Sequence, residues 1–121
     1  MLNKESLKAR TELLRSSGVI DDDVAAFADA VAEKLNDDFR DDLSETFMTH
    51  LVMAVQRIKK GEPAEGLPQE IFDEVKSNAH FAEAKALYKE LMEKCPYELP
   101  NQEIDFLLTH LTTLLDNKEE L

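Results

Sequence analysis

Apolar side chains recur along this chain every three or four residues, and breaks in the pattern separate six segments. This spacing places the apolar positions on one face of an α-helix. Glycine and proline fall at the segment boundaries, and the alternation typical of strands is not apparent. The pattern therefore predicts an all-α protein. The expected helices cover about residues 3–16, 21–39, 41–60, 68–76, 78–92 and 100–115.

Residues that favour helix ends support these boundaries. Three aspartates at residues 21–23 can accept free amide hydrogens and offset the positive end of the second helix dipole. Gly61 can adopt a left-handed C-cap after the third helix, and Pro63 prevents its continuation. Ser77 or Asn78 is expected to cap the fifth helix. The apolar stripe of the second helix, which sets its expected length, consists of Val24, Phe27, Val31, Leu35 and Phe39.

Composition and charge narrow the classes of protein. The 121 residues suffice for one domain, and 43% hydrophobic with 33% charged residues is a globular composition. Twenty-six acidic residues against 14 basic ones give a net charge of -12, which repels a phosphate backbone. We therefore expect no direct binding of nucleic acid. An RNA-binding arm is the alternative to a solvated helix face for the basic residues near the start, Lys4, Lys8, Arg10 and Arg15.

Features of an enzyme, a metal site or a membrane protein are not apparent. The longest apolar runs are five residues each, too short for a bilayer span or a signal sequence. Cys95 is the single cysteine, and no two histidines have the spacing of metal ligands. We therefore expect a cytoplasmic protein with no cofactor, no metal and no membrane contact that is not an enzyme. A hydrolase or a metalloenzyme is the disfavoured alternative.

Histidines are the candidates for chemistry. On a helical wheel, His50 lies at the edge of the buried face of its helix. Arg57 follows it by two turns, about 10.5 Å along the axis. An ion pair with a carboxylate is the ordinary role for Arg57, and an anion site shared with His50 is the alternative. The last helix has a second flank, typical of packing on two sides within the fold or across a subunit boundary. That flank consists of Glu103, Phe106, His110 and Leu114.

Two short motifs surround His50 and His110, which are 60 residues apart. The first consists of Thr49, His50, Leu51, Ala54, Arg57, Ile58, Lys59, Lys60 and Gly61. The second consists of Leu99, Pro100, Glu103, Phe106, Thr109 and His110. Together these motifs resemble those of the PTS regulatory domain (PRD) family, which occurs in bacterial antiterminators and activators. Phe81 and Ala84 also resemble the aromatic and alanine positions of the family's fourth helix.

The resemblance covers about residues 20–118 and implies a compact five-helix PRD-type bundle with an extra N-terminal helix. Residues 1–19 are then the N-terminal helix and turn, residues 20–118 the PRD-like domain, and residues 119–121 a tail. The resemblance also implies that His50 and His110 accept phosphoryl groups from HPr or an enzyme II component of the sugar phosphotransferase system. Arg57 is the matching basic residue that contacts phosphate or a partner. His80 matches neither histidine and is expected to be exposed in a first helical turn.

By the same resemblance, the protein is a phosphorylatable regulatory domain that controls transcription or carbohydrate use through a partner protein. Family members usually carry two such domains fused to a nucleic-acid-binding module, whereas this chain has one. A homodimer is expected from the second apolar flank of the last helix. Many members have an acidic residue before the first histidine, where this chain has Thr49. The competing hypothesis is a degenerate helical interaction or dimerisation module whose histidines only pack.

Overall fold

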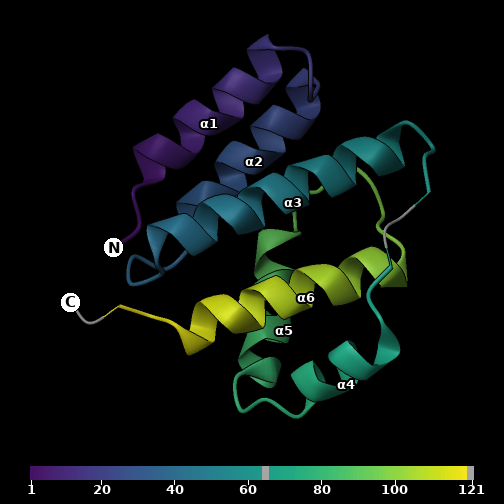
Figure 1. Ribbon diagram of the computed structural model, residues 1–121. Helices are drawn as coiled ribbons and strands as arrows, with labels where there is room; N and C mark the ends of the chain where they lie inside the picture. The colour runs from purple at the N-terminus through teal and green to yellow at the C-terminus, as the bar shows by residue number, and fades with distance from the viewer. Residues whose placement is uncertain (64–65, 120–121) are drawn as a thin grey trace.

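Six α-helices form the regular structure of the protein in a computed structural model that describes residues 1–63 and 66–119 (Figure 1). No strand occurs in these two ranges. The prediction of an all-α bundle is confirmed. Residues 120 and 121 of the expected tail lie outside the described residues. In chain order the helices are α1 (Lys4–Ser16), α2 (Asp22–Lys34), α3 (Asp41–Lys59), α4 (Gln69–Lys76), α5 (Phe81–Leu91) and α6 (Asn101–Asp116).

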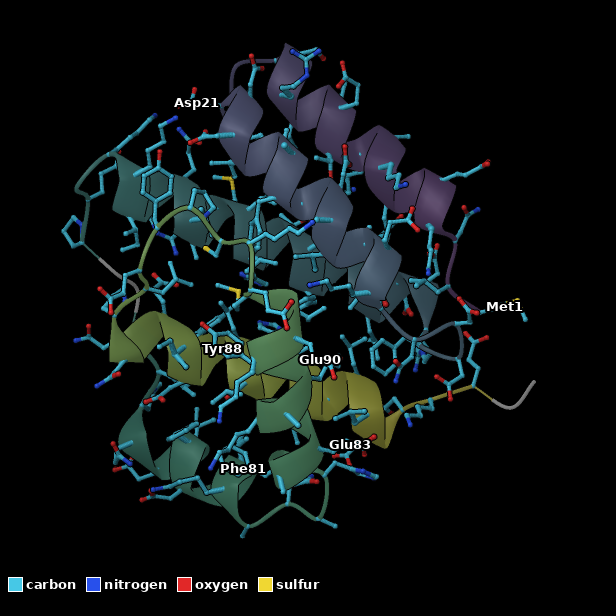
Figure 2. The ribbon with its side chains drawn as sticks, turned by 180° about the vertical axis from the view of Figure 1, so that it is seen from behind. Met1, Asp21, Phe81, Glu83, Tyr88 and Glu90 are labelled. Carbon is cyan, nitrogen blue, oxygen red and sulfur yellow. The ribbon has the colours of Figure 1, made fainter. Side chains whose placement is uncertain are left out.

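The helices pack in two groups that share one core. α1 and α2 form an antiparallel hairpin that covers one side of α3, while α6 lies on the other side of α3 and runs in the opposite direction (Figure 1). α5 crosses the back of α6, where Figure 2 labels Tyr88 and Glu90. No helix within the described residues is long and apolar enough to cross a membrane. The largest buried apolar side chains are Leu7, Ile20, Phe39, Phe47, Leu51, Leu91, Leu107, Leu111 and Leu114.

The end of α3 follows the prediction made from its glycine. Gly61 has a φ of 73°, the left-handed conformation that strains residues with a Cβ. Its N–H donates to the carbonyl of Ile58 at 3.0 Å, and the next N–H donates to the carbonyl of Arg57 at 2.9 Å. These two bonds form a Schellman cap. The cap therefore fixes the backbone of the last turn of α3, which carries Arg57.

The prediction that α2 continues to residue 39 is wrong. α2 ends at Lys34, and Leu35 has an extended backbone with a ψ of 146°. Leu35 and Phe39 are nevertheless buried, because the chain turns and places both side chains on the core. The three residues between them are Asn36, Asp37 and Asp38, which favour turns over helix interiors. The apolar spacing therefore predicts correctly that Leu35 and Phe39 are buried, but it predicts a helix where the chain forms a turn.

Polar side chains join the start of α2 to the end of α3. Of the three aspartates expected to accept free amide hydrogens, Asp23 accepts one from the Val24 N–H at 2.9 Å, whereas Asp21 makes no side-chain cap on its own helix. The Asp21 carboxylate instead accepts one hydrogen bond from the Gln56 side chain at 3.1 Å and is 2.9 Å from Lys59 Nζ. Lys59 Nζ also lies 2.8 Å from Asp23, to which the Tyr97 hydroxyl donates at 2.7 Å. Lys59 is the main reason that the pKa of each aspartate lies below its ordinary value.

Candidate functional site

The two motif histidines meet where α3 and α6 lie side by side. The imidazole rings of His50 and His110 stack, with centroids 4.5 Å apart and planes 25° apart. Phe106, one turn before His110 on α6, lies 5.2 Å from the His50 ring and 5.0 Å from the His110 ring. The second flank of the last helix therefore faces α3 within the fold. Two residues that are 60 positions apart in the sequence form one pair.

Both imidazoles remain in reach of solvent. His50 and His110 are half-buried, and neither ring forms a hydrogen bond within the described residues. A ring nitrogen that had neither a hydrogen bond nor contact with solvent would be a buried atom without a partner, and within the described residues no nitrogen of His50 or His110 is of this kind. Each ring nitrogen therefore has access to water. Rings sealed in the core could not react with another protein, and these two are not sealed.

Burial sets the protonation state of the second histidine. Burial, together with a smaller effect of the neighbouring His50, lowers the pKa of His110 to about 4. His110 is therefore neutral at neutral pH, with one ring nitrogen protonated and a lone pair on the other. An imidazole in this state can act as a nucleophile without first losing a proton.

Replacing His110 by glutamine is expected to remove part of the acid sensitivity of the fold. The pKa of His110 is about 4 in the folded protein against 6.5 as the ordinary value. Between these two values the unfolded chain binds a proton that the folded chain does not, so stability falls as pH falls from 6.5 to 4. Urea unfolding at about pH 7.5, 6 and 5 measures this loss. Parallel pH profiles for the wild type and His110→Gln would contradict the expectation, because the carboxylates affect both proteins alike.

Arg57, the predicted phosphate or partner contact, forms an ion pair across the same interface. Its Nη2 lies 3.0 Å from Oε1 of Glu103, a residue that is only 2% exposed. The ordinary role expected for Arg57, pairing with a carboxylate, is the one observed. Arg57 lies seven residues after His50, and Glu103 lies seven residues before His110. One antiparallel register therefore accounts for both contacts.

Glu103 is the site residue whose role the sequence analysis missed. The helical wheel places it on the same flank as His110, which does not by itself identify it as the partner of Arg57. The sequence does contain a signal for this pair, namely the equal spacing of seven residues between His50 and Arg57 and between Glu103 and His110. When two antiparallel helices bring one pair of residues together, they also bring together the residues two turns away on each helix.

His80 lies outside the histidine pair. It precedes α5 and its side chain is 41% exposed, with Nδ1 3.4 Å from Glu83 and Nε2 3.5 Å from Asp116. The expectation that Ser77 or Asn78 caps this helix is wrong, because His80 is its N-cap residue and no side chain caps it. Asn78 Oδ1 instead accepts a hydrogen bond from the His80 N–H at 2.8 Å within the preceding turn. No group of three or more histidine, cysteine or acidic side chains suited to a metal occurs in residues 1–63 and 66–119.

Thr49 connects the site to the N-terminal helix. Its hydroxyl accepts a hydrogen bond from Nε of Arg10 on α1 at 3.1 Å. The position at which the family resemblance leads us to expect an acidic residue thus contacts a cation in this chain. α1 therefore lies against the segment that carries His50.

Comparison with known proteins identifies one family. The PRD domain family matches residues 26–114, about three quarters of the chain, a range that includes both paired histidines, all of α3 and most of α6, but not α1. "Uncharacterized protein YhfY" of Escherichia coli (strain K12) is 28% identical over 109 residues, which cover 87% of this chain and 91% of YhfY. No solved structure matches the chain significantly.

Proposed function

The chain belongs to the PRD domain family, and we propose that it is a phosphorylatable regulatory domain of the sugar phosphotransferase system. Domains of this family are regulated by that system through phosphorylation and are generally non-catalytic. On this proposal the protein receives phosphoryl groups and is not an enzyme. It needs no cofactor, and it acts in the cytoplasm, where the phosphoryl donors of the system are found.

The paired rings of His50 and His110 carry the proposal. Both lie in reach of solvent and face each other 4.5 Å apart, so a donor that docks over α3 and α6 meets both acceptors at one place. The donor is HPr or an enzyme II component. Arg57 contacts the donor or the phosphate from the same interface, where Glu103 holds its guanidinium.

The transfer needs only groups that this site and the donor provide. The unprotonated ring nitrogen of His110 or His50 forms a bond to phosphorus while the donor's bond from phosphorus to its own imidazole nitrogen breaks. The donor imidazole leaves with the electron pair and takes up a proton, and the acceptor ring releases its remaining proton to water. The acceptor then carries about 1.5 to 2 additional negative charges.

The charge gained on phosphorylation gives the site a regulatory effect. A phosphoryl group at the surface of α3 and α6 adds repulsion towards an acidic partner or a new contact for an arginine. We infer that it shifts the association of the chain with a second copy or with a regulatory protein. Through that partner the chain controls transcription or carbohydrate use, without contact of its own with nucleic acid or membrane. Sedimentation of the protein before and after phosphorylation measures the shift.

Phosphoryl uptake tests the proposal. Incubation with phosphorylated HPr, or with a phosphorylated enzyme II component, is expected to give the wild-type chain an acid-labile phosphate. His50→Gln and His110→Gln are each expected to retain uptake, because the other histidine remains. The double variant is expected to take up none. Intact-mass measurement at neutral or basic pH gives the occupancy.

His80→Gln is the matched control, because His80 is an accessible histidine that lies outside the pair. It is expected to take up phosphate as the wild type does. A wild-type chain that gains nothing from either donor, or a double variant that gains as much as the wild type, would contradict the proposal. Absence of uptake would instead favour the packing module, for which the stacked rings and Phe106 are the supporting observation.

A further inference from the structure

The N-terminal helix runs beside α3 and brings a cation to the residue before His50. Successive contacts advance along both helices, so α1 and α3 run in the same direction (Figure 1). Hydrogen bonds of 3.0, 3.4 and 3.1 Å join Asn3 to Asp41, Ser6 to Glu45, and Arg10 to Thr49.

Arg10 differs from the other arginines in its partner. Arg15, Arg40 and Arg57 each form an ion pair with a carboxylate. Within the described residues Arg10 forms none, although the chain has 26 acidic residues against 14 basic ones. Its guanidinium contacts the Thr49 hydroxyl through Nε, and the side chain is exposed. The two terminal amino groups of the guanidinium are therefore available to an anion.

The position of Arg10 suits an anion on His50 in particular. Thr49 and His50 are consecutive on α3, about 100° apart around its axis, so Thr49 meets α1 while His50 meets α6. A phosphoryl group on His50 would present three acceptor oxygens and about 1.5 to 2 negative charges on the residue next to the one that Arg10 contacts. Arginine binds phosphate through paired N–H donors, which makes it better suited to this contact than lysine.

From this juxtaposition we propose that Arg10 binds the phosphoryl group carried by His50, and that Thr49 holds its guanidinium beside the acceptor before transfer. The inference rests on the proposed function and adds α1, which lies outside the family match, to the phosphorylation site. An acidic residue at position 49 would pair with Arg10 and neutralise it. The threonine anchors the guanidinium and leaves its charge for the phosphate.

Phosphorylation of each histidine separately tests the role of Arg10. Phosphoramidate is the donor, because this small molecule transfers phosphoryl groups to histidine without a docking surface. In the His110→Gln background, Arg10→Gln is expected to lower the phosphate on His50 at steady state by about tenfold or more, the effect of one charge-assisted hydrogen bond. In the His50→Gln background the same change is expected to leave the phosphate on His110 within about twofold, because Arg10 contacts the residue next to His50 only.

Two further variants separate phosphate binding from a structural effect. Arg15→Gln removes an arginine of the same helix that pairs with Glu12 and Asp22, and it is expected to change neither histidine. Arg10→Lys keeps the charge and loses the paired donors, so it is expected to give an intermediate level on His50. Thermal unfolding of each variant verifies that the fold is retained.

The outcomes distinguish the role of Arg10 from the proposed function. Equal losses in both backgrounds, or no loss on His50, would overturn the role of Arg10 and leave the histidines as acceptors. Phosphate on neither histidine, with phosphoramidate and with phosphorylated HPr, would overturn both. A loss confined to His50 supports the assignment of Arg10.

Discussion

Arg57→Ala is expected to lower the free energy of unfolding by about 3 kcal/mol, as is usual when one partner of a buried ion pair is removed. The reason is the environment of Glu103, which is 2% exposed and lies 3.0 Å from the guanidinium. A carboxylate that loses its cation in such a place keeps the cost of desolvation without the compensating attraction. Urea unfolding at neutral pH measures the change.

Arg40→Ala is the matched control for this effect. Arg40 pairs with Asp42 at 2.8 Å, but both side chains are largely exposed. Water and salt screen such a pair, so its loss is expected to change stability by less than about 1 kcal/mol. Glu103→Gln provides a second comparison, because Arg57 is 23% exposed in its side chain and can turn towards water when the carboxylate is neutralised. If Arg57→Ala cost no more than Arg40→Ala, the pair would contribute no more than a surface contact.

The helices could be predicted from the sequence because their determinants are local. Gly61 ends α3 through its own backbone conformation, and no distant residue is needed for that effect. Leu35 and Phe39 show where local reasoning fails. Their apolar spacing fits a helix, but burial of both requires only that they face the core, and a turn achieves this as well. The periodicity of apolar residues indicates which positions are buried. The polar residues between those positions determine whether the backbone forms a helix or a turn.

The candidate site could be predicted in its residues but not in its contacts. A wheel placed His50 at the edge of a buried face and His110 on a second flank, and both positions agree with the structure. The stacking of the two rings depends on how α3 and α6 align, which no property of either helix determines alone. The contact of Arg10 with Thr49 depends likewise on the packing of α1 against α3. Contacts of this kind depend on how the helices pack around the common core, so they could not be predicted from the sequence of any one helix.

One phosphoryl group per chain is the expected limit of phosphorylation, on His50 or on His110 but not on both. The ring centroids are 4.5 Å apart, so two phosphoryl groups would lie close together. At a separation of roughly 6 Å, two groups of about -1.5 charge each repel by roughly 6 kcal/mol at an effective dielectric constant of about 20. Phosphorylation of one ring therefore opposes phosphorylation of the other. Intact-mass measurement after exhaustive incubation with phosphorylated HPr gives the number of groups.

The single-histidine variants decide whether exclusion is the reason for that limit. If His50→Gln and His110→Gln each gain one group while the wild type also gains only one, both rings are competent and one excludes the other. Two groups on the wild type would contradict exclusion, and so would a variant that gains none, because one ring would then be inactive. Exclusion also has a functional consequence. Two donors that prefer different histidines would compete for each chain, so the site would report which donor is more abundant instead of adding their signals.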